Sequence, residues 1–313
     1  MAKKPKSGSV LLSPGRRLWN SVKFPLLFLA PWLIGLCVFS IYPVLSSLYL
    51  SFTNFNLFDT PAFVGIDNYL LLFADPRFLK ACQVTLVYVF VGVPLQLIFA
   101  LLLALLLNKG IPGLKYFRAI YYLPALLGGS VAISILWRQL FGLDGLYNSI
   151  LMFLGLADSE NLISWISNPN YSIYTLIALR VWQFGSPMII FLAGLKQIPN
   201  ELYESASIDG AGTVRKLWNI TLPMLSPVLL FNLIMQIISA FQAFTPAYII
   251  SGTGSLGGNL DSLLLYTIYL YVMGFQYFKM GIASAMAWIM LLAVGILTVL
   301  IFKVSKNSVH YSD

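Results

Sequence analysis

Long apolar runs separated by short polar connections set the pattern of this chain. A transmembrane helix needs about 20 consecutive apolar residues to cross roughly 30 Å of hydrocarbon. Runs of that length predict six membrane spans, over residues 24–45, 83–107, 116–137, 172–195, 224–250 and 281–303. The pattern therefore predicts an all-α polytopic membrane protein with six transmembrane helices.

A further apolar patch, Leu263–Met273, is rich in tyrosine and too short to span. Two interpretations of it stay open: an interfacial helix, or an extended outer start of the sixth span. We expect a basic tail, residues 1–23, before the membrane domain of residues 24–303, and a short tail, residues 304–313, after it. The basic tail has the composition of a disordered segment.

Composition agrees with a membrane protein, because 59% of the 313 residues are hydrophobic and only 10% are charged. Soluble domains carry about 45–50% apolar and about 25% charged residues. So few charges could not cover a soluble surface. The first apolar run, from Phe24, is longer than the core of a signal peptide and is followed by no small-residue cleavage pattern, so we expect a retained first helix.

The formal net charge of +8 could suggest a nucleic-acid partner, but the positions of the basic residues indicate membrane topology instead. They gather before the first span and in alternate loops, so the positive-inside rule predicts that both termini lie in the cytoplasm. We expect no nucleic-acid binding. The basic residues on the predicted inner side are Lys3, Lys4, Lys6, Arg16, Arg17, Lys23, Lys109, Lys115, Arg118, Lys196, Arg215, Lys216, Lys303 and Lys306.

Residues that carry enzyme or metal chemistry are scarce. Cys37 and Cys82 lie in or beside apolar runs and His310 lies near the C-terminus, so we expect no metal site and no catalytic cluster. All 11 acidic residues lie in predicted loops or tails. A self-contained secondary transporter would then lack an intramembrane carboxylate for ion coupling, although that class stays open as the alternative function.

The polar segment between the fourth and fifth spans, residues 196–222, is unusually long, because helix–helix connections normally have about two to eight residues. Pro199 and Asn200 suit the start of a helix, and Gly210 and Gly212 suit its end. A second amphipathic turn follows, before Pro223. The residues alone leave two interpretations open: an ordinary connection, or a docking surface for a partner.

This segment resembles the EAA loop of permeases in binding-protein-dependent ABC importers. Ser205 stands where alanine is usual, which exchanges one small residue for another. The matching run is Glu204-Ser205-Ala206, Asp209-Gly210-Ala211, Ile220-Thr221-Leu222-Pro223 and Pro227.

The resemblance extends over nearly the whole chain and is strongest to the first membrane subunit of importers for maltose, glycerol-3-phosphate, trehalose and other oligosaccharides. The chain lacks the large outer domain and extra N-terminal spans of the maltose version. The further matching motifs are Tyr42-Pro43, Val64-Gly65-Ile66-Asp67-Asn68-Tyr69, Gly145-Leu146-Tyr147-Asn148 and Ile198-Pro199.

The resemblance implies a type I ABC importer permease in the bacterial plasma (inner) membrane, working by alternating access. It also implies a second homologous permease as a heterodimeric partner, two ATPase subunits and an extracytoplasmic solute-binding protein. The chain has no Gly-x-x-x-x-Gly-Lys-Ser/Thr motif, so ATP and Mg are expected in the partner ATPase. The residues expected to couple to that ATPase are Glu204, Ser205, Ala206, Ile208, Asp209, Gly210, Ala211 and Gly212.

Polar and aromatic residues inside the predicted spans are candidates for the solute pathway, because polar groups in a membrane usually face a cavity or another helix. Helix–helix hydrogen bonding is the competing interpretation for each of them. The candidates are Ser130, Arg180, Gln183, Ser186, Gln236, Ser239, Phe241 and Gln242.

Arg180 is the most unusual candidate, because it lies roughly 12 Å inside the predicted fourth span at 1.5 Å per residue. One interpretation pairs it with Asp144, Asp158 or Glu160 of the preceding outer loop. The other makes Arg180, together with Arg138, a site of attraction for an acidic sugar. The sequence therefore predicts import of a sugar or oligosaccharide, an acidic one being a candidate, with glycerol-3-phosphate as a non-sugar alternative.

Overall fold

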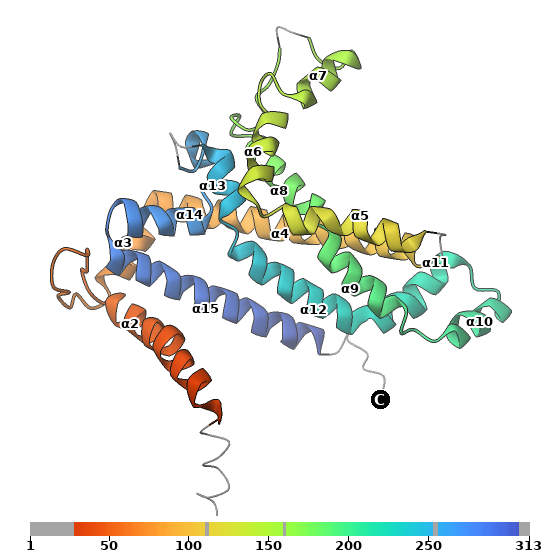
Figure 1. Ribbon diagram of the computed structural model, residues 1–313, viewed down its shortest axis with the longest axis horizontal. Helices are drawn as coiled ribbons and strands as arrows, with labels where there is room; N and C mark the ends of the chain where they lie inside the picture. The colour runs from red at the N-terminus through yellow and green to blue at the C-terminus, as the bar shows by residue number, and fades with distance from the viewer. Residues whose placement is uncertain (1–27, 110–112, 159–160, 253–255, 307–313) are drawn as a thin grey trace, which may run out of the picture.

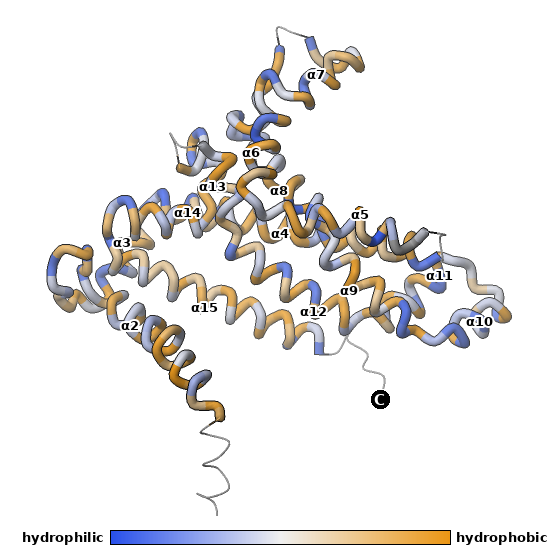
Figure 2. Tube along the Cα trace, in the orientation of Figure 1, coloured by the Kyte–Doolittle hydropathy of each residue, from blue (hydrophilic) through white to orange (hydrophobic). Residues whose placement is uncertain are grey.

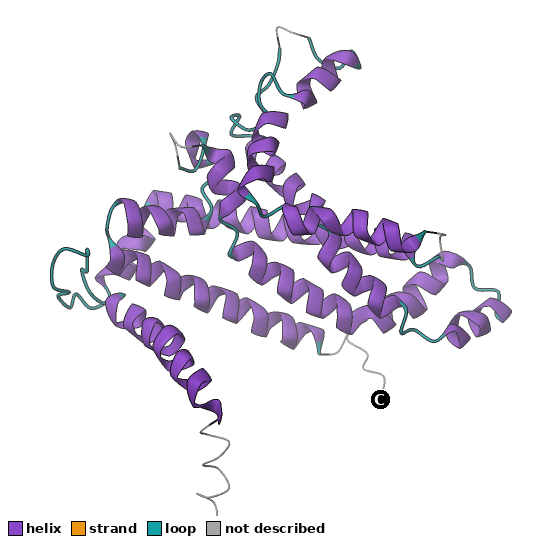
Figure 3. Ribbon diagram, in the orientation of Figure 1, coloured by secondary structure: helices purple, strands orange, loops and turns teal. Residues whose placement is uncertain are grey.

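The computed structural model describes residues 28–109, 113–158, 161–252 and 256–306, without the side chains of Leu114 and Lys115. The predicted basic tail 1–23, residues 307–313 of the C-terminal tail, and Glu160 lie outside the described residues. Within them, helices are joined by loops and no strand is formed (Figure 3). A single antiparallel bridge joins Thr53 to Phe63.

Four helices are each long and apolar enough to cross a membrane. The first, Phe28–Leu50, includes η1 (Cys37–Ile41) and α2 (Tyr42–Leu50). The others are α4 (Pro76–Leu107), the continuous helix formed by α11 (Thr213–Lys216), η2 (Leu217–Thr221) and α12 (Leu222–Phe241), and α15 (Met280–Ser305).

Two further spans are bent, which brings the possible total to six if each bent pair is one span. The predicted span 116–137 is not straight, because α5 (Leu114–Leu127) and α6 (Val131–Leu140) meet at 94°. Pro124 removes a backbone donor near the end of α5, and Gly128 and Gly129 then favour a break. The predicted span 172–195 consists of α8 (Ser172–Trp182) and α9 (Gly185–Leu195), which meet at 43°.

Two other boundaries differ from the sequence-based expectation. The second span begins at Pro76 rather than 83, because Asp75 accepts a hydrogen bond from the backbone N–H of Arg77 and caps the helix. The fifth span, predicted over 224–250, ends as α12 at Phe241, and α13 (Thr245–Ser251) begins after a break, with Pro246 in its first turn.

The patch Leu263–Met273 is not a continuous start of the last span. It forms the separate short helix α14 (Tyr266–Tyr271), followed by η4 (Val272–Gln276). Leu263, Leu264 and Ile268 are fully buried, so the patch belongs to the core. Phe278, with φ of +55°, lies in the turn that separates it from α15.

α8, α9 and α12 pack against α4, whose Ala81, Ala100 and Ala104 are fully buried, and α15 lies along α12 and α2 (Figure 1). The first helix diverges from this bundle, and no residue of its most apolar stretch is buried. Apolar residues dominate the long helices, whereas polar residues gather at α10 (Asn200–Ile208) and α11, at one end of the molecule (Figure 2).

Away from α10, two of the motifs that carry the family resemblance fix loops. Asn68, in α3 (Asp67–Ala74), donates through its amide to the backbone oxygens of Ser51 and Thr53 at the end of the first helix. Asn148, in α7 (Leu146–Phe153), donates to the backbone oxygens of Gly142, Leu143 and Ile163. The α6–α7 hairpin held in this way stands away from the bundle in Figure 1.

Candidate functional site

The loop singled out in the sequence folds into α10, a tight turn and α11. The prediction of a helix starting at Pro199-Asn200 is confirmed, because α10 begins at Asn200 with Pro199 as its N-cap. Glu201 lies in the first turn, where the positive end of the helix dipole favours an acidic side chain. No residue of α10 is fully buried, so the helix extends beyond the packed bundle.

Gly210 ends α10 in a Schellman motif. Its φ of +75° lies in the left-handed region, which glycine adopts without the steric cost that a Cβ brings. The backbone N–H of Gly210 donates to the oxygen of Ser207 at 3.1 Å, and that of Ala211 donates to the oxygen of Ala206 at 2.8 Å. This pair of bonds satisfies the last carbonyls of the helix and turns the chain back towards α11.

Few bonds hold α10 against α11 and η2, and they leave most of the α10 surface free. The Lys216 ammonium donates to the Ser207 hydroxyl at 2.6 Å, and the hydroxyls of Tyr203 and Thr221 are 3.0 Å apart. Between the two helices lies a cavity of about 220 Å³. Apolar side chains point outwards here, since Ile208 is 88% exposed and Trp218 is 65% exposed.

The structure brings the predicted coupling residues together at this end of the molecule. Exposed apolar side chains on a polar helix–turn–helix are typical of a surface that another protein covers. Glu204, Ser205, Ile208, Asp209, Gly210 and Gly212 are exposed, whereas Ala206 and Ala211 are half-buried.

Arg180 lies elsewhere, inside the bundle, and only 6% of it is exposed. Its guanidinium donates to the backbone oxygen of Gln236 at 2.7 Å and to the side-chain oxygen of Gln236 at 3.3 Å. It also lies over the ring of Tyr88, 5.5 Å from the ring centroid. Gly92 of α4 leaves room for the Arg180 side chain, because a Cβ there would lie 3.2 Å from Cδ of Arg180.

The expected pairing of Arg180 with an outer-loop carboxylate is wrong for Asp144 and Asp158. The only ion pair within the described residues joins Arg77 to Asp261, at 2.8 Å. Glu160 lies outside the described residues. The Nε of Arg180 has no hydrogen-bond partner in the described part of the chain, so this charge is buried among neutral groups.

Three other pathway candidates lie near the bends. The Gln183 amide donates to the backbone oxygen of Gly128, in the break between α5 and α6, at 3.2 Å. The Ser130 hydroxyl accepts the N–H of Ile133 and caps α6. Ser186 is half-buried in the first turn of α9. The interactions of Gln183 and Ser130 are thus with backbone groups.

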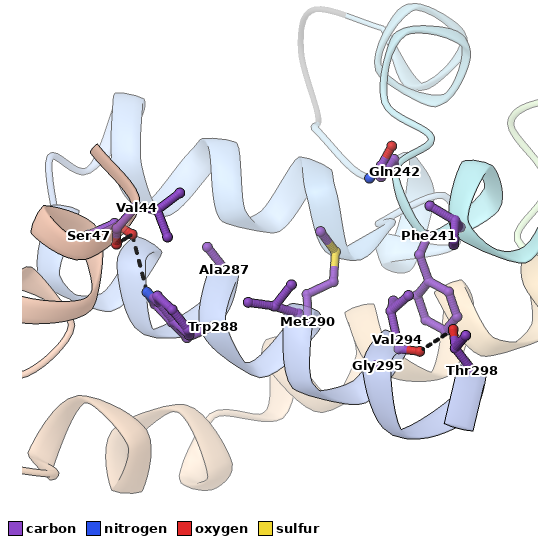
Figure 4. A pocket seen from close by; sticks show the side chains of 12 residues that line it. Val44, Ser47, Phe241, Gln242, Ala287, Trp288, Met290, Val294, Gly295 and Thr298 are labelled. Atoms are coloured by element: carbon purple, nitrogen blue, oxygen red, sulfur yellow. Dashed lines mark hydrogen bonds between the residues drawn. The ribbon is translucent and has the colours of Figure 1, made fainter. Parts of the chain in front are cut away.

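Of the candidates on or beside α12, two lie on open surfaces, whereas Phe241 is buried. Ser239 and Gln242 are exposed, and Gln236 is half-buried. Phe241 and Gln242 line a groove of about 560 Å³ that also contains Trp288 of α15 and Ser47 of α2 (Figure 4). Trp288 donates through its indole N–H to the Ser47 hydroxyl at 3.2 Å.

Sequence reasoning missed Gln96 of α4, a buried residue whose amide donates to the backbone oxygen of Gln183 at 3.1 Å. The sequence signal for this hydrogen bond was Pro187. Proline has no N–H, so the carbonyl four residues before Pro187, that of Gln183, lacks its usual helical donor. Such a carbonyl inside a membrane requires a donor from elsewhere.

Comparison with known proteins gives consistent matches. The family model described as "Binding-protein-dependent transport system inner membrane component" matches residues 71–310. The probable ABC transporter permease YesP of Bacillus subtilis is 50% identical, over 91% of this chain and 91% of YesP. The arabinooligosaccharides transport system permease AraP of Bacillus subtilis is 35% identical, over 97% of this chain and 95% of AraP.

A solved structure has the same fold. The crystal structure of a bacterial ABC transporter involved in the import of the acidic polysaccharide alginate contains a chain that superposes with a TM-score of 0.79. The match covers 93% of this chain and 99% of that chain, at 23% sequence identity. The bent spans and the α10–α11 loop described above thus belong to a fold that a solved transporter shares.

Proposed function

Because the chain belongs to the family of inner membrane components of binding-protein-dependent transport systems, we propose that it forms half of the translocation pathway of an ATP-driven importer for a sugar or oligosaccharide. The relative AraP, which covers nearly the same length, is named for arabinooligosaccharide transport, and this supports the solute class. The chain acts as a transport subunit, and hydrolysis of ATP, with its Mg, belongs to a separate ATPase.

The observation that carries this proposal is the α10–α11 surface. Its glycine turn is fixed by backbone bonds, yet Ile208 and Trp218 remain mostly exposed. A docked ATPase would cover these side chains, and the residues from Glu204 to Gly212 would transmit its closure to the spans. This is alternating access by rigid coupling between a docked helix and a two-state pore.

The first helix and the family description support further partners. In the most apolar stretch of the first helix no residue is buried within this chain, which supports a second homologous permease that would complete the pathway. The family description supports an extracytoplasmic solute-binding protein. The basic residues on the α10 side, Lys196, Arg215 and Lys216 among them, support a cytoplasmic location for that end and for both termini.

Arg180 favours a specific solute class, the acidic saccharides. It is a buried cation whose described partners are a carbonyl, an amide oxygen and an aromatic ring, all neutral. A carboxylate of a uronate oligomer would supply the missing negative partner, with Gln236 and the exposed Ser239 and Gln242 offering hydrogen bonds to sugar hydroxyls. Phe241 would stack on a sugar ring.

The test is reconstitution of this chain with the second permease, the ATPase and the binding protein of the same cell in proteoliposomes. We expect ATP-driven, binding-protein-dependent uptake of a labelled arabino-oligosaccharide or oligogalacturonate. Uptake without the ATPase would instead show a self-contained secondary transporter, and uptake of glycerol-3-phosphate alone would show a non-sugar importer.

The acidic-saccharide part is tested with Arg180→Gln. Loss of one charged hydrogen bond to the solute predicts about a tenfold or larger fall in oligogalacturonate uptake, with neutral oligosaccharide uptake little changed. Undiminished uptake of every anionic saccharide would remove Arg180 from solute recognition and leave the importer itself standing.

A further inference from the structure

Two amides connect three spans at the bends, the second span to the fourth and the fourth to the third. Gln96 of α4, 3% exposed, donates to the backbone oxygen of Gln183 at 3.1 Å. The side chain of Gln183 then donates to the backbone oxygen of Gly128 at 3.2 Å. Both acceptors lie at breaks in helices, so each amide replaces a donor that the bent backbone does not supply.

Glycines allow the two bends to lie this close. A Cβ on Gly128 would lie 2.2 Å from Cγ of Gln183. A Cβ on Gly185 would lie 2.6 Å from the backbone oxygen of Tyr121 in α5. The start of α9 is therefore packed directly against the backbone of α5, and the two breaks form a single contact region.

This region lies between the two functional ends of the chain. α9 leads through the buried Leu195 and Ile198 into α10, which carries the predicted docking surface. On the other side of the breaks, α6 leads into the α6–α7 hairpin. A displacement of α10 that moves α9 as a body reaches the contact between Gln183 and Gly128, and α6 begins just beyond Gly128.

The Gln96 amide is also only half satisfied. Its side-chain oxygen is buried and has no hydrogen-bond partner in the described part of the chain. An unpaired buried acceptor raises the free energy of the conformation that contains it. A conformation in which this oxygen accepts a hydrogen bond would be more stable. This is expected of a group that changes partners between two conformations.

We infer that Gln96 and Gln183 are positioning residues for translocation, which hold the bends of the third and fourth spans in register so that movement of α9 reaches α6. The inference rests on the proposed transport function. For this role, the Gln183 carbonyl must accept its hydrogen bond from a side chain of another helix, because such a donor can exchange partners. A backbone N–H of the same helix could not.

Pro187 makes a direct test possible. In Pro187→Ala the new N–H can bond the Gln183 carbonyl within the helix, which makes the Gln96 amide dispensable for stability and straightens the bend. The variants are Gln96→Leu, Pro187→Ala and the double variant. Gln83→Leu, an exposed glutamine on the same helix, is the matched control.

The measurements are the melting temperature of the full complex and its uptake of labelled arabino-oligosaccharide and oligogalacturonate per ATP hydrolysed. For Gln96→Leu we expect a lower melting temperature and about a tenfold fall in uptake per ATP, the effect of one hydrogen bond. The double variant should recover the melting temperature and keep the low uptake. Gln83→Leu should match the wild type.

Recovery of both stability and uptake in the double variant would overturn the inference, since Gln96 would then only satisfy a carbonyl. Wild-type uptake by Gln96→Leu would overturn it as well. If the wild-type complex itself shows no ATP-driven uptake of either probe, the proposed function fails, and that outcome is distinct from a defect confined to the variants.

Discussion

The α10–α11 loop and the bends at Gly128 and Gln183 are both built on glycine and proline, yet they use their side chains in opposite ways. In the loop, backbone bonds around Gly210 fix the turn and leave Glu204 and Ile208 free for a partner. At the bends, side-chain amides are bonded to backbone carbonyls within the bundle.

The difference follows from the solvent of each region. Water satisfies the loose backbone groups of an exposed loop, so its side chains can be reserved for recognition. Hydrocarbon satisfies none, so every carbonyl freed by a bend must find a donor inside the protein. A polar residue within a span is therefore first a candidate for backbone bonding, and its role in a pathway requires a further observation, such as the unpaired Nε of Arg180.

The largest effect is expected at Gly185, where the start of α9 lies against the backbone of α5. In Gly185→Ala the new Cβ would meet the Tyr121 oxygen at 2.6 Å and Cα of Tyr122 at 2.9 Å. Because backbone atoms cannot move aside cheaply, we expect a loss of about 3 kcal/mol in stability, measured as yield and melting temperature in detergent.

Gly295→Ala is the matched control for that change, because nothing lies within 4 Å of a Cβ at this position in α15. It should leave stability unchanged or raise it by up to about 1 kcal/mol, the difference in helix propensity between alanine and glycine. Equal stability of the two variants would contradict the close packing of the bends.

A smaller effect is expected in the loop, at Gly210. Gly210→Ala places a Cβ on a residue with φ of +75°, which costs about 1 kcal/mol and affects only the local turn. We expect weaker ATPase binding in pull-down assays with an unchanged melting temperature of the isolated chain. Gly212→Ala, with φ of −70° and open space around the Cβ, should behave as wild type.

The smallest effect is expected at the end opposite to α10, where the Arg77 guanidinium contacts Asp261 through two hydrogen bonds of 2.8 and 2.9 Å. The two side chains are 42% and 25% exposed. An exposed ion pair contributes about 0.2–1 kcal/mol, so Asp261→Asn should lower the melting temperature only slightly, and less at high salt. A loss as large as that of Gly185→Ala would show that this pair, and not the bends, governs stability.

These regions also differ in how far the sequence could predict them. The loop was predicted because its signals are local: Pro199 starts α10, Gly210 ends it, and its length exceeds an ordinary connection. The angle between α5 and α6 was not predicted, because it depends on which donor reaches each carbonyl that the bend frees. Gln96 lies 87 residues from Gln183 in sequence, and only tertiary packing brings them together.

The patch Leu263–Met273 shows the same limit. Its apolar run is too short to span, and the sequence alone could not show that α14 is buried within the bundle, with the Tyr266 hydroxyl donating to the backbone oxygen of Met286 at 2.6 Å. Arg180 was recognised as unusual from its depth, whereas its partner Gln236 could not be chosen over the outer-loop carboxylates without the fold.

The docking role of the α10–α11 surface is tested most directly by measuring whether that surface binds the ATPase. Ile208→Glu changes a side chain that is 88% exposed, and Val304→Glu, at a residue that is 76% exposed in the last turn of α15, is the control. Each variant is co-purified with the second permease and the ATPase in mild detergent. We expect Ile208→Glu to lose the ATPase while Val304→Glu retains it. Full ATPase binding by Ile208→Glu would contradict the docking role of this surface.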